Sequence, residues 1–173
     1  MKFVAIDFET ADYGPDSACS VALVRVEGNE IVAKTQTLIR PPRSRFQFTY
    51  IHGIKWEHVK NAPTFGEIWP TMEEFLQGAD HFVAHNASFD RGVLQACCTA
   101  SGLSMPALPF RCTVKLARQT WQLPSNKLNL VCEHLQIPLK HHDALSDAEA
   151  CARIVIAAQQ HHRLFSPKKI LKW

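Results

Sequence analysis

Carboxylates and histidines occur in three segments that lie far apart in this 173-residue chain. The segments read DFET at residues 7–10, HNASFD at residues 85–90 and HDALSD at residues 142–147. From them we single out four acids and one imidazole, those of Asp7, Glu9, Asp90, Asp147 and His142. Magnesium and manganese take carboxylate oxygens, and two such ions about 3.5–4 Å apart stabilise the attacking and leaving oxygens of a phosphoryl displacement. The set therefore favours a two-cation site that cleaves phosphodiesters such as those of nucleic acid.

Asp7 and Glu9 share one side of a predicted strand, because side chains two positions apart on a strand point to the same face. Burying two like charges together is unfavourable unless a cation compensates them. The flanking residues Val4, Ile6 and Phe8 indicate a buried setting. The alternative is a solvent-exposed strand end at which the two acids bind nothing.

The second and third segments are less specific when each is taken alone. Asp90 falls in the first turn of a predicted helix, where a carboxylate interacts favourably with the helix dipole without binding a metal. His85 at a strand end is compatible with ordinary packing, and Asn86 with a turn. His142 precedes Asp147 by five residues, so it can lie in the loop just before the helix that carries Asp147. From there its imidazole can accept a proton from a cation-bound water. Only the combination of the three segments is specific.

Hydrophobic periodicity predicts a mixed sheet flanked by helices, because strands joined as hairpins are followed by alternating strands and helices. The predicted strands cover 2–9, 18–26, 30–40, 81–85 and 109–112, and the predicted helices cover 64–77, 88–100, 113–121, 127–136 and 143–161. A Gly-Asn pair at 28–29 indicates a tight hairpin, and two consecutive prolines predict that residues 41–50 form a loop. Pro70 is expected to kink or divide its helix, and Ser88 is expected to cap the next one.

Taken together, the three segments resemble the DnaQ-like family of 3′→5′ exonucleases, in the branch called DEDDh after its acids and histidine. An apolar strand leads into DFET, VAHNASFD follows at residues 83–90, and HDALSDA completes the set at residues 142–148. IHGI at residues 51–54 is similar to the family's segment between the third strand and the first large helix. The resemblance extends from about residue 2 to residue 158. It implies a ribonuclease-H-like fold, an α/β domain with a mixed five-stranded sheet flanked by helices.

The resemblance also implies a role for each site residue. Asp7, Glu9 and Asp147 would surround one divalent cation, magnesium or manganese, while Asp7 and a water held by Asp90 would bind a second. His142 would be the general base. The terminal 3′ nucleotide would be contacted by Phe8, Thr10, His52, Asn86 and Phe89. The family's frequent DTETTG is DFETAD in this chain, so Asp12 stands where the family has glycine, a change that bears on the terminal sugar and not on the cations.

Three further features have both a functional and a structural explanation. His141 lies beside His142, and we expect it to point in a different direction, as a loop or surface residue. Residues 40–50 interleave arginines with aromatic residues, as in loops that hold phosphates and stack unpaired bases, or as in a loop whose rings only pack against the domain. Lys115, Arg118 and Lys127 are candidates for lining the approach of a nucleic-acid strand.

Length and composition bound the remaining possibilities. An apolar content of 46% in 173 residues is enough for one core and too little for two comfortable domains, so we expect an exonuclease domain over residues 1–163 and a basic tail over residues 164–173. No apolar run approaches the roughly 20 residues that cross a bilayer, and the first residues lack a signal-peptide pattern. Six cysteines without regular spacing predict reduced thiols. These features predict a cytoplasmic protein.

Positive charge is concentrated toward the C-terminus. Residues 111–173 carry ten of the 19 Lys and Arg residues but only four of the 16 acids. Such an excess could attract a polyanion, or it could simply be a solvated helical surface.

These observations predict a metal-dependent 3′→5′ exonuclease that releases nucleoside 5′-monophosphates from single-stranded or frayed DNA. Two alternatives stay open. One is an exoribonuclease of the same family, because the choice depends on whether a pocket accepts the 2′-hydroxyl. The other is a proofreading subunit that acts mainly when docked on a polymerase. The expected partners are nucleic-acid 3′ ends, with a homodimer and a polymerase or repair protein as further possibilities, and no membrane association is expected.

Overall fold

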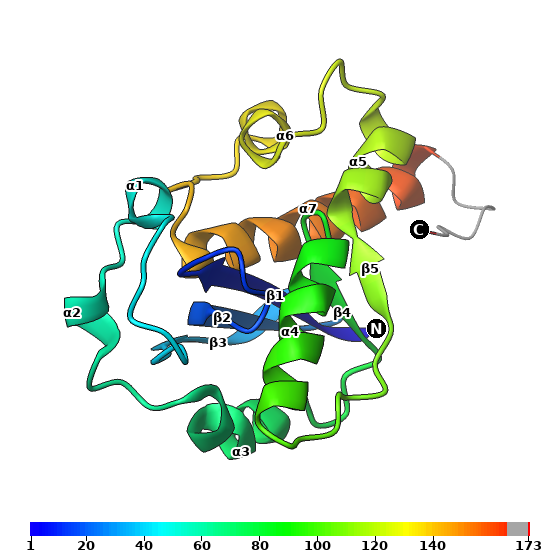
Figure 1. The fold of residues 1–173 in the computed structure, drawn as a ribbon. Coiled ribbons are helices and arrows are strands. Elements are labelled where there is room, and N and C mark those ends of the chain that lie inside the picture. Colours follow the sequence, from blue (N-terminus) through cyan, green and yellow to red (C-terminus); the bar gives the residue numbers. More distant parts are fainter. Residues whose placement is uncertain (166–172) are drawn as a thin grey trace.

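The computed structural model describes residues 1–165 and residue 173 as a five-stranded sheet with helices on both faces (Figure 1). The strands are β1 (Lys2–Thr10), β2 (Ala18–Glu27), β3 (Glu30–Leu38), β4 (His81–Ala84) and β5 (Phe110–Cys112). The helices are α1 (Thr49–His52), α2 (Trp56–Val59), α3 (Phe65–Leu76), α4 (Ser88–Ala100), α5 (Thr113–Trp121), α6 (Leu128–Leu135) and α7 (Ala144–Phe165). The strand order is β3-β2-β1-β4-β5, with antiparallel pairing among the first three and parallel pairing from β1 to β5. The predicted ribonuclease-H-like architecture is therefore confirmed.

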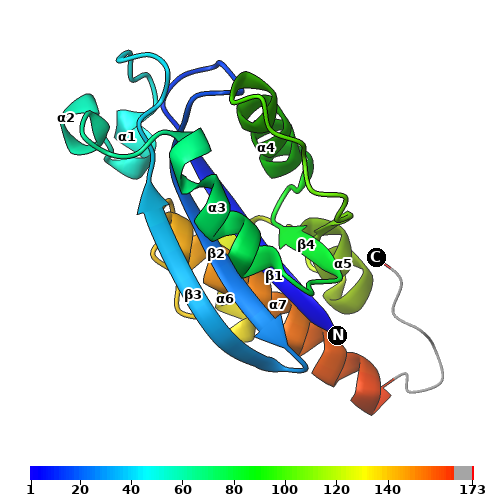
Figure 2. The same cartoon turned by 90° about the horizontal axis from the view of Figure 1, so that it is seen from below.

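Alternate residues of β1 pack into two separate cores, one on each face of the sheet. Phe3 and Ala5 pack with residues of α5, α6 and α7. Val4 and Ile6 point to the other face and pack with residues of α3 and α4. Figure 2 shows α3 on the side of the sheet opposite α7. Because side chains alternate along a strand, the next two side chains on the α7 face are those of Asp7 and Glu9. The hydrophobic pattern of β1 thus directs both acids toward the helix that carries Asp147.

Most of the predicted elements are confirmed, and the differences are local. The Gly-Asn pair at 28–29 joins β2 to β3 as expected, with Glu27 opposite Glu30. α3 continues through Pro70 as a single helix, so this proline does not divide it. Two short helices were missed, because α1 begins inside the segment predicted to be a loop and α2 follows three residues after α1. Helices of four residues have too little periodicity to be seen in a sequence.

The junction between β4 and α4 differs from the prediction. α4 begins at Ser88, so the expectation that Ser88 caps this helix is wrong. The turn is made instead by Asn86, which adopts the left-handed conformation with φ of 67°, as Asn does more readily than most residues. The carbonyl of Asn86 accepts a hydrogen bond from the Phe89 amide at 2.9 Å, and its side-chain oxygen accepts one from Ser88 Oγ at 3.2 Å.

Some expectations concern the periphery of the fold. α7 extends to Phe165, and the rest of the expected basic tail, residues 166–172, lies outside the described residues. Within the described part of the chain, no helix is both long enough and apolar enough to cross a membrane. Five of the six cysteines are buried and all six are free thiols, as expected.

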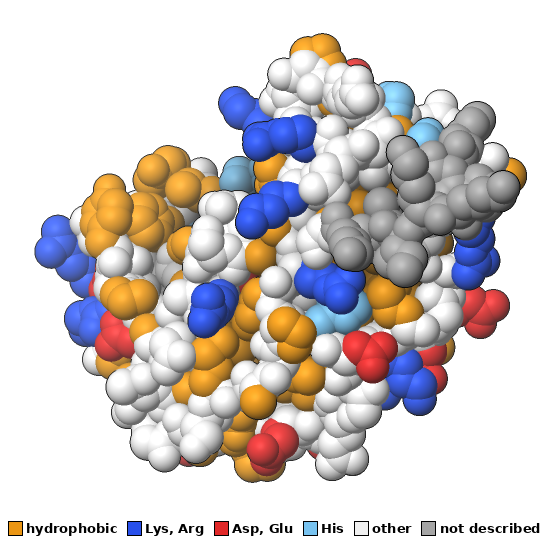
Figure 3. All heavy atoms as spheres, turned by 90° about the vertical axis from the view of Figure 1, so that its right-hand side faces the viewer, with side chains coloured by type: hydrophobic (Ala, Val, Ile, Leu, Met, Phe, Trp, Pro, Cys, Tyr) orange, Lys and Arg blue, Asp and Glu red, His pale blue; other side chains and the backbone are white. Residues whose placement is uncertain are grey.

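Positive charge on the face that Figure 3 presents is not gathered into one patch. Lys and Arg side chains there are spread among uncharged atoms.

Candidate active site

Four carboxylates from three elements meet at the end of the central strand. Asp7 and Glu9 come from β1, Asp90 from the first turn of α4 and Asp147 from the first turn of α7. Oxygens of Asp7, Glu9 and Asp147 lie within 4.8 Å of one another. Asp90 joins the group from α4, and its Oδ1 accepts a hydrogen bond from the amide of Phe8 on β1 at 3.1 Å. The structure therefore brings together all four acids that the sequence singled out.

Burial of this cluster changes the acidity of its members. Asp90 and Asp147 are 2% and 4% exposed. Desolvation, and then repulsion from Asp147 and Asp90, raise the pKa of Glu9 to about 8. Desolvation raises the pKa of Asp90 to about 7, and burial together with the other three acids raises the pKa of Asp7 well above its usual range. Within residues 1–165, no Lys or Arg forms an ion pair with any of the four.

The carboxylate cluster has the donor atoms that divalent cations bind. Ionised carboxylates this close together repel strongly in a dry environment, and bound divalent ions reverse that penalty. The donor set consists of carboxylate oxygens, which suits hard cations such as magnesium and manganese rather than thiolate-seeking metals. Asp7, Glu9 and Asp147 are the residues that fit such an ion most directly, because their oxygens already converge.

The loop before α7 places two imidazoles at Asp147, not one. Asp147 Oδ2 accepts a hydrogen bond from the His142 amide at 3.1 Å and lies 3.0 Å from His141 Nδ1. The two rings are stacked, with centroids 3.9 Å apart and planes inclined by 20°. The expectation that they point in different directions is wrong, because His142 has a φ of 65° and this left-handed residue folds the second ring back onto the first. Burial and the adjacent His141 lower the pKa of His142.

A cleft of about 740 Å³ opens above the carboxylates. Its lining includes every residue predicted to contact a nucleotide, namely Phe8, Thr10, His52, Asn86 and Phe89. Arg118 and Lys127 also line it, as expected, whereas Lys115 does not. Of the aromatic residues at 40–50, Phe48 lines the cleft, Phe46 packs against a small core and Tyr50 is 82% exposed.

Several lining residues were not predicted, chiefly Asn126 and Asn129 on the wall opposite Phe48. They lie at and just before the start of α6, and their place in the cleft depends on how residues 122–127 fold over β4. His85 fixes that fold, since its Nε2 donates to the carbonyl of Asn126 at 2.9 Å while Nδ1 lies 2.8 Å from Thr113 Oγ1. Desolvation lowers the pKa of His85 to about 4, so it is a neutral packing residue, as one interpretation of the sequence had it.

His52 connects the wall of the cleft that carries Phe48 to β1. Its Nδ1 accepts a hydrogen bond from the Ile54 amide at 3.0 Å, so Nε2 carries the proton and donates to the carbonyl of Thr10 at 3.1 Å. Burial lowers the pKa of His52, which keeps this tautomer neutral. The ring is thus fixed beside Thr10 at the rim of the carboxylate cluster.

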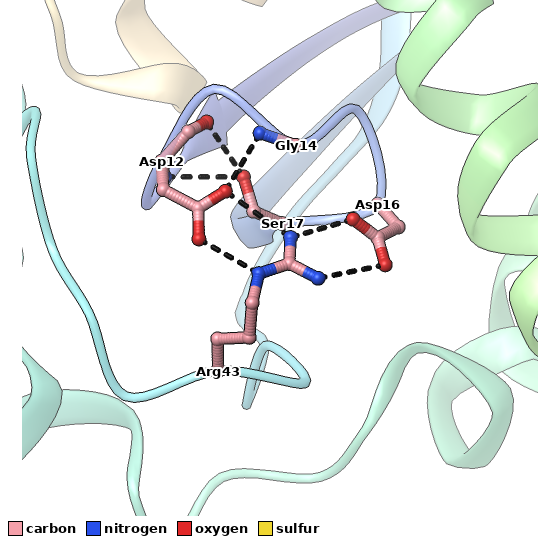
Figure 4. Close-up of polar contacts among 5 residues, drawn as sticks. All are labelled: Asp12, Gly14, Asp16, Ser17 and Arg43. Atoms are coloured by element: carbon pink, nitrogen blue, oxygen red, sulfur yellow. Dashed lines mark hydrogen bonds and ion pairs between the residues drawn. The ribbon is translucent and has the colours of Figure 1, made fainter.

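Arg43 holds the same wall in place from outside the cleft (Figure 4). Its guanidinium donates to both oxygens of Asp12 at 2.9 and 3.1 Å and to both oxygens of Asp16 at 3.0 and 2.6 Å. Gly14 lies so close to the guanidinium that a β-carbon there would collide with it. Arg43 is therefore engaged by carboxylates, which argues against its predicted role as a phosphate ligand. The residue that replaces the family's glycine, Asp12, is one of the two carboxylates of this clamp.

A mixed five-stranded sheet whose central strand ends in a carboxylate cluster, with imidazoles at its edge, is the arrangement that the sequence predicted from its resemblance to the DEDDh exonucleases. The chain belongs to the RNase_T exonuclease family, whose model matches residues 4–155.

Relatives of known sequence include large replication proteins. The DNA polymerase III PolC-type proteins of Thermotoga maritima and Clostridium perfringens are 35% and 34% identical to 89% of this chain, which spans only 12% and 11% of their length. A putative bifunctional exonuclease/endonuclease protein of Mycobacterium tuberculosis is 31% identical over 90% of the chain and 26% of its own length.

Solved structures give the same fold. Exonuclease X in complex with 5′ overhanging duplex DNA is 27% identical, with a TM-score of 0.74 over 91% of both chains. The nuclease domain of 3′hExo, a DEDDh family member bound to rAMP, has a TM-score of 0.79 over 92% of both chains at 21% identity.

Glu9 should make the stability of the metal-free protein depend on pH. Its pKa rises from 4.5 to about 8 on folding, so the folded state keeps a proton that the unfolded chain loses, and stability decreases as pH rises through this window. Neutral buried histidines oppose the trend only below pH about 6.5. Between pH 6.5 and 8 we expect Glu9 alone to lower stability by roughly 1.5 kcal/mol, about 3–6 °C in Tm.

Calorimetry with a chelator present measures this effect. The Tm of the Glu9→Gln variant should fall less steeply than that of the wild type over the same pH range, and equal slopes would contradict the assignment.

Arg43→Gln should loosen residues 43–48. Removing the guanidinium leaves Asp12, which is 7% exposed, without its ionic partner, and we expect a loss of about 1–3 kcal/mol in the free energy of unfolding. Trypsin cleavage after Arg45 should become faster. Arg25→Gln is a matched control, because Arg25 is also bound by a carboxylate and by two carbonyls, but near the end of α3. It should lower stability without accelerating cleavage at Arg45, and equal acceleration in both variants would remove the local role of Arg43.

Proposed function

We propose that the chain is a 3′→5′ exonuclease that uses two divalent cations, magnesium or manganese, to release nucleoside 5′-monophosphates from single-stranded or frayed DNA. The observation that carries the proposal is the convergence of Asp7, Glu9, Asp90 and Asp147 at the floor of a cleft with His142 at its edge. In this proposal residues 1–163 form the exonuclease domain and residues 164–173 its basic tail.

The chemistry divides among these residues. When bound, two cations polarise a water and stabilise the charge that develops on the phosphate and on the leaving oxygen. Asp7, Glu9 and Asp147 would hold the first ion, and Asp7 with a water on Asp90 would hold the second. His142 would accept the proton of the attacking water, and its lowered pKa keeps the imidazole neutral for this task near pH 7.

The two walls of the cleft support a role in holding an unpaired end. Phe48 and Phe89 offer faces on which bases can stack, and Arg118 and Lys127 offer charge to phosphates. The Phe8 ring is buried, so Phe8 would meet the nucleotide through its backbone. Thr10, His52 and Asn86 would contact the terminal nucleotide between them.

The preference for DNA is supported by similarity to PolC-type DNA polymerase III proteins. The same similarity favours a second candidate, a proofreading subunit that acts mainly when docked on a polymerase, because in those proteins the matched segment is a small part of a much longer chain. An exoribonuclease is the alternative that matched substrates test.

Direction and metal dependence can be tested with one set of 5′-labelled oligonucleotides. Purified protein with magnesium or manganese should shorten DNA from a free 3′ end and should fail on a 3′-phosphate, because another dianion beside the carboxylates has no counter-charge. Asp7→Ala, which removes the proposed bridging ligand, should be inactive but folded. Matched RNA gives the sugar preference. Cleavage that survives a chelator, or equal rates on free and blocked 3′ ends, would overturn the proposal.

His142→Ala should reduce turnover by roughly 10²–10⁴-fold, the usual scale for loss of a general base, while leaving substrate binding nearly intact. His141→Ala should reduce turnover much less. It leaves the proposed base in place, and the backbone amide of residue 142 still holds Asp147. Single-turnover rates of the two variants on one labelled oligonucleotide provide the comparison. A larger loss in His141→Ala would reassign the base to His141.

A further inference from the structure

Two imidazoles and one carboxylate converge on the solvent side of the carboxylate cluster. Ligand atoms of His141, His142 and Asp147 all lie within 4.8 Å of one another, and His141 Nδ1 is 3.0 Å from Asp147 Oδ2. His141 is 40% exposed at its side chain, so the group opens to solvent and can adjust its rings. His141 has no part in the chemistry proposed above, which leaves its approach to Asp147 unexplained.

This donor set differs from that of the neighbouring carboxylates. Imidazole nitrogen suits zinc, copper and nickel, whereas magnesium and manganese favour oxygen alone. Zinc bound by three protein ligands and one water is a common arrangement. Zn–N and Zn–O bonds of about 2.0–2.2 Å in a tetrahedron place ligand atoms about 3.3–3.5 Å apart, close to the separation of His141 and Asp147. A metal ion lies in the plane of each imidazole that binds it, so the stacked His142 ring must turn away from the His141 ring to complete the set.

Backbone geometry holds the ligands together without a metal. The left-handed conformation of His142 and the hydrogen bond from its amide to Asp147 fix the loop against α7. Lys140, the nearest lysine in sequence, is directed to Asp143 at 3.3 Å and not to Asp147. A cation at the two rings therefore replaces no ion pair between Asp147 and a Lys or Arg within the described residues.

We propose that His141, His142 and Asp147 bind a zinc ion that switches the nuclease off. The ion would take an oxygen of Asp147 that the catalytic cation needs, and it would take the lone pair with which His142 accepts a proton. Binding would therefore remove a ligand and the base in one event. The inhibitory part of this inference rests on the proposed function, whereas the binding part does not.

Binding is tested on the full chain without nucleic acid, by competition between the protein and a chromophoric zinc chelator. The wild type should bind one zinc ion at this site, and His141→Ala should weaken that binding by about tenfold or more, since even loss of an outer-shell partner costs 10–100-fold. His58→Ala is the matched control, because His58 lies on α2 and bonds to the amide of Lys55. Unchanged affinity in His141→Ala, with loss in Asp7→Asn, would place zinc among the carboxylates and overturn the inference.

Inhibition is tested in the magnesium-dependent assay, with each variant normalised to its own zinc-free rate. Micromolar zinc should inhibit the wild type and His58→Ala alike, and the half-inhibitory concentration for His141→Ala should rise in step with its weaker binding. Equal inhibition of all three would overturn the switch. If the wild type cleaves nothing with magnesium or manganese, the proposed function fails, and the binding measurement still decides whether the zinc site exists.

Discussion

Mutual repulsion among four carboxylates, those of the buried Asp90 and Asp147 and of the partly buried Asp7 and Glu9, is the constraint around which this fold is arranged. Desolvation and the neighbouring charges raise the pKa values of Asp7, Glu9 and Asp90 together, so in the absence of a cation the cluster favours protonation over ionisation. The surrounding sheet must hold these groups close despite that repulsion. Asp7 and Glu9 accordingly sit on the central strand, where β2 pairs with both of them and the pairing with β4 has ended at Ala5. Asp90 and Asp147 sit at helix starts, where a negative charge is favoured.

The alternation of β1 is what makes the cluster possible in a small domain. Phe3 and Ala5 bury one face beneath α7, and the same period of two delivers both acids of DFET to that face. Asp90 reaches the group from the opposite face by bonding to the strand's own backbone at Phe8. The core and the site are therefore set by one register, because a slip of one residue would move every acid of β1 away from α7.

The sequence predicted the sheet, the long helices and the four acids, because each depends on a local pattern or on a resemblance that extends over the whole chain. It failed where the outcome depends on a backbone conformation that no pattern encodes. Ser88 looks like a cap, yet Asn86 makes the turn with a positive φ. His141 is an exposed turn residue as expected, yet its ring does not point away from His142, because the same conformation at His142 stacks the two rings.

Arg43 was ambiguous for a different reason, since an arginine beside aromatic residues fits a phosphate ligand and a structural clamp equally well until its partners are known. The structure gives those partners as Asp12 and Asp16. Asp12 occupies the position of the family's glycine. The residue that departs from the motif is therefore also a residue of the clamp. The clamp lies outside the cleft and ties residue 43 to the segment after β1. The Gln47 amide donates to the carbonyl of Ala11 at 2.7 Å and ties the same two segments together a second time. The two connections position Phe48 relative to Thr10. The variation thus leaves the carboxylates untouched and acts on the wall of the cleft that carries Phe48 and His52.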